Sequence, residues 1–373
     1  LFSSIFFFPY YFTIAQSNTF KISGKVVDED NIPQEFVTVY INSSSIFTQT
    51  DSLGSFMLNI PSNNVDFELV VSMVGFNIQK QKFTRNTVPK FLTIKLTSNT
   101  LDEVVIKAKQ DRFWSRKWHV FRNGLLGETA FARQCSFENR ENIHLSLDYD
   151  RKTVFANSSK TFVVLNKALG YKIHVDLHTF SSDGVETNYA ASKFYEDDLA
   201  IEEDKRNSQL KNRKKAFEAT PNLFLHSLAK RNFRDAKIEV FKIKSMVDVF
   251  LGRTTVKQHL EEGKLIRVND STIYRFDSLS KRHILHSELP LLVFNKKVLN
   301  YFRNPFTDYT YMFSKIDLPN QYAVFTENGF ISVPNGITFH YQWGNEGLAS
   351  ALPENYKVPE EMPIVAESPI IDL

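Results

Sequence analysis

Apolar and polar residues alternate in short runs over the first hundred residues of the chain. The runs are FKISGKVVD (20–28), EFVTVYI (35–41), SIFTQ (45–49), FMLNI (56–60), DFELVVSMVGF (66–76), NIQKQKF (77–83) and KFLTIKL (90–96). Alternation with a period of two is typical of strands with one buried face, and turn-forming residues such as Asn31 and Pro33 separate the runs. Short strands at this spacing predict a small antiparallel β-sandwich over residues 19–98.

The stretch TQTDSLGSF, residues 48–56, is predicted to be a structural hairpin between two of these strands. Asp51 can accept hydrogen bonds from the backbone amides that follow it. Gly54 supplies the positive φ that closes the turn, and Phe56 returns to the core face. We assign Asp51, Gly54, Phe56 and Gly75 to structural turns, because one carboxylate offers too few oxygen ligands for Ca²⁺.

Residues 113–356 mix helical and strand periodicities. Phe113, Trp114, Trp118, Phe121 and Leu125 recur near helical spacing, which predicts a helix. NLFLHSLAKRNF predicts another helix, with Pro221 at its start. The strand-like runs are HLSLDYD, KTVFANSS, TFVVLN, YKIHVDLHTF, VETNYAASKFY, TIYRFDS, RHILHSE, LPLLVFN, YTYMFSKI, YAVFTENGFIS and ITFHYQW. We expect a mainly β fold: a sandwich, a linker at 99–112, a β-rich domain with a few helices at 113–356, and a loosely attached acidic, Pro-rich tail at 357–373.

The N-terminal run LFSSIFFFPYYFTIAQS is apolar up to Ala15 and contains Pro9. It is too short and too interrupted to span a bilayer. Thr13-Ile14-Ala15 forms a small-x-small cleavage site before Gln16, so residues 1–16 are predicted to be a secretory signal with a truncated basic region. A hydrophobic first strand is the alternative. The signal predicts an exported protein, and no later run reaches the length of a membrane helix.

Composition narrows the classes of function only slightly. Phe accounts for 34 of 373 residues, which favours pleated, half-buried surfaces. The net charge of +3 does not predict a nucleic-acid partner. The single cysteine, Cys135, cannot form an internal disulfide, and its apolar neighbours predict a buried, inert thiol.

The segments ISGKVVDEDNIPQEFVTVYI, TDSLGSF and VVSMVGF resemble the carboxypeptidase-regulatory-like domain, a transthyretin-like sandwich. The matching positions are Gly24, Val26, Asp28, Pro33, Val37, Val39, Thr50, Asp51, Gly54, Phe56, Ser72, Gly75 and Phe76. This resemblance covers about a fifth of the chain. LDEVVIKAKQ (101–110) resembles the linker after this domain in exported Bacteroidetes proteins, including TonB-dependent transporters. About 260 residues follow this linker. They are too few for a transporter barrel and show no long series of amphipathic strands.

Most of the remaining chain resembles exported Bacteroidetes proteins described as carboxypeptidase-like regulatory domain-containing. The segments concerned are FRNGLLGETAFARQCSFEN, VLNKALGYKIHVDLHTF, NRKKAFEATPNLFLHSL and GFISVPNGITFHYQWGNEGLASALPENY. One departure is Glu218-Ala219-Thr220-Pro221, where the family's small-residue turn is expected. The resemblance implies a location and an architecture, a transthyretin-like sandwich followed by an uncharacterised β-rich region. It implies no catalytic residue.

Two short motifs contain residues that are common metal ligands. His174, Asp176 and His178 alternate in IHVDLHTF and would share one face of a strand, which could supply three ligands. The alternative is a solvated polar face opposite Ile173, Val175 and Leu177. His259 and Glu262 in HLEE have the spacing of zinc carboxypeptidase ligands, with the late His340 as a further ligand. That motif is short, and a catalytic zinc needs another ligand and an open position.

Three other groups of residues have both a structural and a functional interpretation. His283 and His286 in RHILHSE would face opposite sides of a strand. The basic run KRNSQLKNRKKAF (205–217) is interpreted as a solvated helix face, with an anionic partner as the alternative. A dense aromatic group is interpreted as core, or as a sugar- or protein-binding surface if exposed. Its members are Tyr301, Phe302, Phe306, Tyr309, Tyr311 and Phe313.

The sequence therefore favours an exported binding or adaptor protein without catalytic activity, in the periplasm or associated with the outer membrane. The expected partner is a cell-envelope protein, with a glycan as the alternative ligand. No nucleic acid, no cofactor and no catalytic residue are assigned. Two alternatives stay open: a metal-dependent envelope hydrolase that uses His174, Asp176 and His178 or His259 and Glu262, and a carbohydrate-binding protein.

Overall fold

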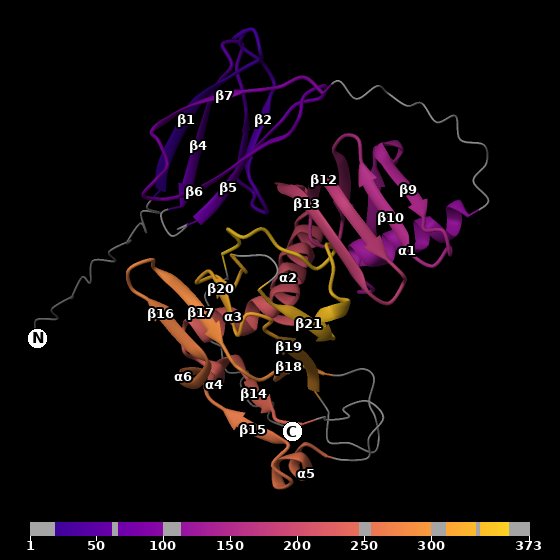
Figure 1. Ribbon diagram of the computed structural model, residues 1–373, viewed down its shortest axis with the longest axis vertical. Helices are drawn as coiled ribbons and strands as arrows, with labels where there is room; N and C mark the ends of the chain where they lie inside the picture. Colours follow the sequence, from indigo (N-terminus) through magenta and orange to yellow (C-terminus); the bar gives the residue numbers. More distant parts are fainter. Residues whose placement is uncertain are drawn as a thin grey trace, which may run out of the picture.

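The computed structural model describes residues 19–61, 66–99, 113–245, 255–299, 311–332 and 336–357 (Figure 1). The fold is mainly β, with a few helices in its second part, as the alternation predicts. In these residues, no helix combines the length and the apolar character that crossing a membrane would require. We call residues 19–99 the sandwich and residues 113–357 the body.

Two facing sheets form the sandwich. The first sheet has the order β4-β1-β7 and contains β1 (Thr19–Val27), β4 (Ser55–Pro61) and β7 (Phe91–Lys95). The second has the order β3-β2-β5-β6 and contains β2 (Thr38–Ile41), β3 (Phe47–Gln49), β5 (Asp66–Ser72) and β6 (Gln79–Thr84). Only β1 and β7 of the described sandwich strands pair in parallel; the other pairs are antiparallel. Alternate apolar side chains such as Ile22, Val39 and Leu58 fill the space between the sheets.

The turn at residues 50–55 fixes the entry into β4. Asp51 Oδ1 accepts the backbone N–H groups of Leu53 and Ser55 at 2.9 and 2.8 Å. Gly54 has φ +71°, and Phe56 is 5% exposed in the sandwich core. The short polar loop therefore uses one carboxylate and one glycine to reverse the chain and return an aromatic side chain to the core.

A sheet with the order β8-β11-β12-β10-β9 opens the body, and β13 pairs with the other edge of β12. Its strands are β8 (Cys135–Glu138), β9 (Ile143–Leu147), β10 (Val154–Ser158), β11 (Phe162–Asn166), β12 (Tyr171–Ser182) and β13 (Thr187–Asp197). Helix α1 (Trp114–Leu126) packs beside β9 and β10. Its apolar stripe places Phe121 and Leu125, both 0% exposed, in the body core, as the helical spacing predicts.

Two further sheets and the other helices complete the body. Helices α2 (Glu203–Ala219), α3 (Pro221–Ala229) and α4 (Phe233–Ala236) precede β14 (Ile238–Ile243). The sheet β15-β14-β18-β19-β21 also contains β15 (Leu265–Val268), β18 (Leu291–Leu299), β19 (Tyr311–Asp317) and β21 (Thr338–Tyr341). The sheet β16-β17-β20 contains β16 (Tyr274–Asp277), β17 (Arg282–His286) and β20 (Tyr322–Phe325), and α5 (Val256–Glu261) and α6 (Asp270–Ile273) are short.

One apolar core links the elements of the body. Phe121 of α1, Phe224 of α3 and Val293 of β18 belong to the same buried cluster. Pro221 is the first residue of α3, where its missing N–H costs no helical hydrogen bond. The predicted start of this helix is confirmed. Cys135 is 8% exposed, and burial raises the pKa of its thiol to about 12, so the predicted buried thiol is confirmed.

Several predictions fall on residues that the structure does not describe. The signal at 1–16, most of the linker at 99–112, the tail from residue 358 and the aromatic residues at 301–310 lie outside the described residues. Of the aromatic group, Tyr311 opens β19, and Phe313 is 5% exposed in a core cluster on one face of the β15-β14-β18-β19-β21 sheet.

Replacement of Gly54 by Ala should destabilise the protein more than replacement of Gly75. Both residues have positive φ, +71° and +89°, which costs about 1 kcal/mol for Ala. A Cβ at Gly54 would lie 2.5 Å from the Val26 carbonyl oxygen, whereas a Cβ at Gly75 would meet nothing within 4 Å. We expect Gly54→Ala to lower the free energy of unfolding by about 2 kcal/mol more than Gly75→Ala in urea titrations. Equal losses would show that the turn relaxes around the methyl group.

Candidate functional site

Strand β12 carries the first predicted metal motif, and its two faces meet different parts of the chain. Ile173, Val175 and Leu177 are each at most 1% exposed and lie in the body core. The opposite face bears His174, Asp176 and His178 and is turned toward the β3-β2-β5-β6 sheet of the sandwich, with which Asp176 and His178 form hydrogen bonds. Asp176 and His178 therefore lie at the sandwich–body interface, and His174 contacts Glu196 and Phe194 of β13 beside it. The prediction of a solvated polar face is wrong.

Asp176 is the buried charged group at this interface. It is 6% exposed. Its Oδ2 accepts the hydroxyl of Tyr40 on β2 at 3.0 Å, and its Oδ1 accepts the hydroxyl of Thr161 at 2.5 Å. Burial and the Asp176 charge raise the pKa of Tyr40, so the phenol stays protonated and donates. Both oxygens of the carboxylate are thus engaged, one from the sandwich and one from the body.

The two histidines of the motif have partners of their own. His178 Nε2 lies 2.6 Å from Lys80 Nζ on β6 and 3.1 Å from Ser192 Oγ on β13. Burial and the neighbouring Lys80 charge lower the pKa of His178, which suits a neutral ring that accepts from the lysine. His174 Nε2 lies 3.0 Å from a Glu196 carboxylate oxygen, so the ring donates there.

Backbone and apolar contacts extend the interface along β13. Ser43 N–H donates to Lys193 O at 2.7 Å, and Tyr195 N–H donates to Ser44 O at 2.9 Å. The turn after β2 therefore continues the edge of β13 as a short parallel bridge. Phe194 on β13 packs against Tyr40, with ring centroids 4.7 Å apart. The sandwich is held by main-chain hydrogen bonds as well as by side chains.

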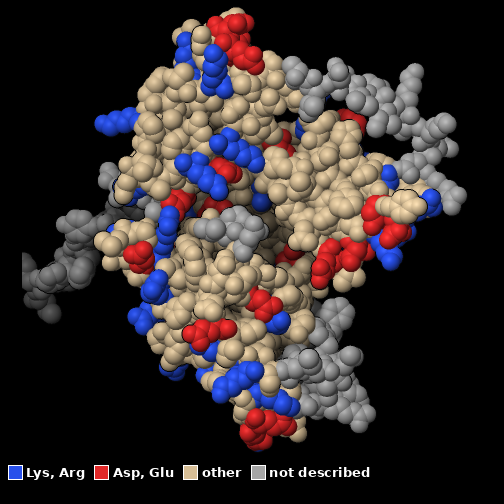
Figure 2. Space-filling model, in the orientation of Figure 1, with Lys and Arg blue, Asp and Glu red and all other residues tan. Residues whose placement is uncertain are grey.

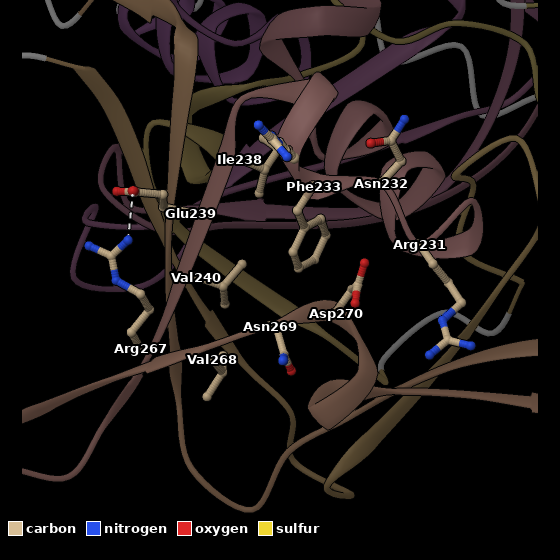
Figure 3. A pocket seen from close by; sticks show the side chains of 11 residues that line it. Arg231, Asn232, Phe233, Ile238, Glu239, Val240, Arg267, Val268, Asn269 and Asp270 are labelled. Atoms are coloured by element: carbon tan, nitrogen blue, oxygen red, sulfur yellow. Dashed lines mark hydrogen bonds and ion pairs between the residues drawn. The ribbon is translucent and has the colours of Figure 1, made fainter.

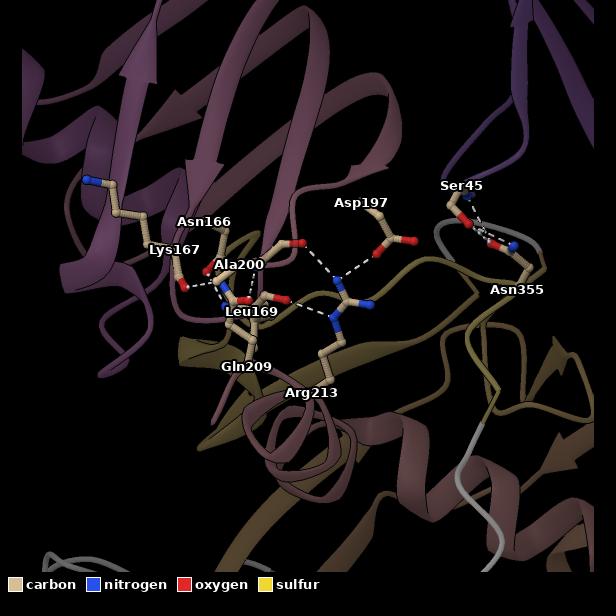
Figure 4. Close-up of polar contacts among 10 residues, drawn as sticks. Ser45, Asn166, Lys167, Leu169, Asp197, Ala200, Gln209, Arg213 and Asn355 are labelled. Atoms are coloured by element: carbon tan, nitrogen blue, oxygen red, sulfur yellow. Dashed lines mark hydrogen bonds and ion pairs between the residues drawn. The ribbon is translucent and has the colours of Figure 1, made fainter. Parts of the chain in front are cut away.

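Two distant segments of the body also contact the sandwich. Glu354 N–H donates to Ser43 O at 2.8 Å. Asn355 exchanges hydrogen bonds with Ser45, accepting the backbone N–H at 2.9 Å and donating to the hydroxyl at 2.9 Å (Figure 4). Arg282 on β17 forms a salt bridge of 2.7 Å with Asp66 on β5. The sandwich thus meets β12–β13, the segment near residue 355 and β17.

The geometry leaves few free electron pairs for a metal ion on β12. Both Asp176 oxygens and His178 Nε2 already accept hydrogen bonds, and His174 Nε2 donates one. A metal bound by all three residues would have to replace contacts that join the sandwich to the body. In the described part of the chain, no three His, Cys, Asp or Glu side chains are grouped so that they could hold a metal ion.

The second predicted motif and the late histidine lie elsewhere in the body. His259 is 3% exposed within α5. Glu262 follows that helix, and its carboxylate lies 2.7 Å from Lys264 Nζ. His340 Nε2 lies 2.7 Å from Asp317 on the neighbouring strand. The HLEE motif is therefore divided between a buried ring and a surface ion pair.

The basic run 205–217 forms most of α2, and one of its cations is structural. Arg213 is 7% exposed, although the run was predicted to be a solvated face. Its guanidinium donates to Leu169 O at 2.7 Å, to Gly170 O at 2.8 Å and to Asp197 at 2.7 Å (Figure 4). It also lies 3.6 Å from the centre of the Tyr171 ring. Arg213 thus fixes the loop before β12 and the end of β13.

Two cavities lie in the part of the body that contains β14 and β15, and the second is also lined by Leu260 of the HLEE motif and by Tyr311. One of about 370 Å³ lies beside α4, β14 and β15. Figure 3 shows Phe233 and Val240 pointing into it, with the Arg267–Glu239 ion pair of 2.9 Å at its edge. The second, of about 350 Å³, shares Arg267 and Glu239. His174, Asp176, His178, His259 and Glu262 line neither cavity.

The contribution of Tyr40 was not predicted from the sequence. EFVTVYI showed alternation, which placed Tyr40 on the face opposite Val39. An aromatic side chain on the outer face of a sandwich sheet can lie in an interface or in water. The residues next to Tyr40 in the sequence do not show which of the two applies. Tyr40 is 0% exposed because the body covers it.

A double-mutant cycle between Tyr40 and Asp176 tests the interface. Tyr40→Phe removes a donor from a buried carboxylate, and Asp176→Asn removes one of two acceptors, so each should lower the free energy of unfolding by about 2 kcal/mol. The double variant should lose about 1 kcal/mol less than the sum. Tyr149→Phe, at a fully exposed tyrosine (101%), is the control and should change little. Additive losses in urea titrations would show that the two groups do not interact.

Replacement of Glu354 should change how stability depends on pH. Burial raises the pKa of the Glu354 carboxyl to about 7; Lys193 opposes the rise and Glu68 adds to it. The folded state therefore holds a proton that the unfolded chain releases near 4.5, so this contribution to stability is full below that pH and is lost as pH rises to about 7. Relative to wild type, Glu354→Gln should gain stability between pH 4.5 and pH 8.

The measurement is urea denaturation of both proteins at pH 4.5, 6 and 8. Other titrating groups are common to both proteins, so their effects cancel in the difference. Glu35→Gln removes an exposed carboxylate from the sandwich and controls for the loss of one surface charge. A difference that stays constant with pH would contradict the assignment.

Comparison with known proteins identifies the sandwich. A search of the curated proteins found no match to the chain. Residues 22–106 match the family model of the CarboxypepD_reg-like domain. The match begins inside β1, spans both sheets and ends beyond β7. The N-terminal β-sandwich is therefore a CarboxypepD_reg-like domain.

Proposed function

We propose that this chain is an exported binding or adaptor protein of the cell envelope, without catalytic activity, in which the regulatory-like sandwich and the body act as one unit. The observation that carries the proposal is the interface built around Asp176. It engages three segments of the body and a buried carboxylate that receives one hydroxyl from each side.

A fixed orientation is what an adaptor requires. Domains that are joined only by a linker move relative to each other unless their interface is large and well packed. Here main-chain hydrogen bonds from Ser43 and to Ser44 and the packing of Tyr40 against Phe194 oppose such motion. The two parts therefore present their free surfaces at a constant distance and angle, so one partner can be positioned relative to another.

The same contacts weigh against a metal-dependent hydrolase at β12. Asp176 and His178 form hydrogen bonds with the sandwich, and His174 forms one with Glu196 on the neighbouring strand. A hydrolytic site needs an open coordination position and room for substrate. We therefore interpret the polar face of β12 as the surface of the body that contacts the sandwich.

The location in the envelope rests on the sequence. The apolar run that ends in Thr13-Ile14-Ala15 has the pattern of a secretory signal, and the chain resembles exported proteins over most of its length. The single, buried Cys135 is compatible with an oxidising compartment, because it has no internal partner and is shielded from reaction.

Affinity purification of the full-length chain from native envelopes in mild detergent tests this proposal. We expect one dominant protein partner, a mature chain that has lost the predicted signal, and less than stoichiometric metal by plasma mass spectrometry. Phe194→Ala loosens the interface and should weaken recovery of the partner several-fold, whereas Tyr149→Ala should not. A monomer without a partner, or stoichiometric metal whose removal abolishes a hydrolytic activity, would contradict the proposal.

A further inference from the structure

The sandwich has a free end opposite the body. On β2, Thr38 pairs with Gln49 and Ser72, whereas Ile41 at the other end pairs with Leu69 and leads into the Ser43–Ser45 turn that contacts the body. The loops that precede β2, follow β3 and follow β5 therefore gather at the far end, at the top of the view in Figure 1. We call residues 28–36, 50–54 and 73–77 the tip.

Backbone contacts hold the loops of the tip together. Phe36 N–H donates to Thr50 O at 3.1 Å, and Thr50 Oγ1 donates to Gln34 O at 2.7 Å. Glu29 accepts the N–H of Ser98 at 2.8 Å, and Asn99 N–H donates to Gly75 O at 2.9 Å. These bonds connect the loops to one another and to the end of β7, so the tip is a preformed surface.

Four large apolar side chains of the tip are exposed to water. Ile32 is 56% exposed, Phe36 68%, Leu53 67% and Val74 71%. Two of them come from the first loop and one from each of the other two loops, so all four face solvent at the same end of the sandwich. Phe47, Met57 and Phe91 are also exposed, but they lie on strands of the domain rather than in these loops. Exposed apolar residues that cluster in this way mark interaction surfaces.

Phe36 also has an unusual backbone conformation. Its φ is +60°, a left-handed value that costs an L-residue about 1 kcal/mol. Packing does not explain the strain, because the side chain remains mostly exposed. A strained residue that the surrounding hydrogen bonds enforce is typical of a functional position, and an exposed aromatic ring is a common anchor in protein interfaces.

The charge of the tip selects the kind of partner. Its three loops contain no Lys, Arg or His and five carboxylates: Asp28, Glu29, Asp30, Glu35 and Asp51. Acidic side chains are prominent at the top of the molecule in Figure 2. Lys25 on β1 and Lys95 at the end of β7 border the tip, since Lys95 pairs with Val27, and Figure 2 shows basic side chains beside the acidic ones. The acidic loops repel anionic lipid headgroups, and pairing of the tip with a second copy of itself would oppose like charges.

We infer that the tip is the docking surface for a partner protein segment in which apolar side chains are flanked by Lys or Arg. The inference rests on the proposed adaptor function and assigns its contact surface. The apolar side chains of Ile32, Phe36 and Leu53 supply the buried centre of the contact, and the carboxylates form a rim that orients the basic residues of the partner.

Site-specific photo-crosslinking of the full-length protein in native envelopes tests the inference. A benzophenone amino acid replaces Phe36 in one variant and Phe91 in the matched control. Phe91 is 60% exposed at the start of β7, on the same sandwich but away from the tip. We expect crosslinks from position 36, and not from 91, to a partner segment with apolar residues beside Lys or Arg.

The crosslinked segment is then made as a synthetic peptide. The double variant Ile32→Ser and Leu53→Ser and the double variant Asp30→Lys and Glu35→Lys should each weaken its binding at least tenfold. Because the altered side chains are exposed, the melting temperature of each variant should stay close to that of wild type. Unchanged affinity in both variants would overturn the inference.

The crosslinking outcomes separate the inference from the function on which it rests. Crosslinks to a partner from position 91 but not from 36 would leave the adaptor function in place and overturn the tip. Crosslinks from position 36 to lipid, to another copy of this chain or to an acidic segment would also overturn it. No protein crosslink at either position, with no partner in the purification described above, would overturn both.

Discussion

The relative placement of the two parts depends on one buried carboxylate. Asp176 lies between a tyrosine of the sandwich and a threonine of the body, and each hydroxyl donates to a different oxygen. A buried charge without partners is strongly unfavourable, whereas a carboxylate with its hydrogen bonds satisfied is tolerated. The contact therefore acts mainly as a constraint on geometry: any orientation of the sandwich that removes Tyr40 leaves a charge half-satisfied in a dry interface.

The remaining contacts are compatible with only one position of the sandwich. Ser43 and Ser44 extend the edge of β13, Lys80 reaches His178, and Arg282 reaches Asp66. These groups come from two strands and one turn of the sandwich and from different elements of the body. Each contact is modest alone, and exposed ion pairs contribute little to stability. Their common requirement for one orientation gives the interface its specificity.

Local pattern was sufficient to predict the elements but not the interface. The strands of the sandwich, helix α1 and the start of α3 at Pro221 follow from alternation, helical spacing and turn residues, because each depends on neighbours in the sequence. The interface pairs residues such as Tyr40 and Asp176, which lie 136 positions apart. The sequence pattern of a strand with a polar face is the same whether that face meets water or another sheet. The spacing of His174, Asp176 and His178 therefore predicted only that they lie on one face of the strand.

Charge runs have the same ambiguity. The segment 205–217 is mostly polar, and most of α2 is exposed, yet Arg213 lies buried against Tyr171 and donates hydrogen bonds to two carbonyl groups. Its long aliphatic stem and planar head allow one residue of a solvated helix to reach inward. No neighbour in the sequence distinguishes Arg213 from Lys211 or Lys214, because the carbonyl groups that select it belong to the loop before β12.

The segment that contains β2 has side chains in three environments: the sandwich core, the interface with the body, and water at the tip. Val37, Val39 and Ile41 point into the sandwich core, Tyr40 points to the body, and Phe36 points to water at the tip. The alternation in EFVTVYI predicts only the side chains that point into the sandwich core. The second environment follows from docking, which covers one end and one face of the sandwich. Docking leaves the opposite end uncovered, so the Phe36 side chain stays in water while its backbone N–H joins the loops of the tip through Thr50. An exposed aromatic ring on a backbone held in this strained conformation is the feature on which the proposed docking surface rests.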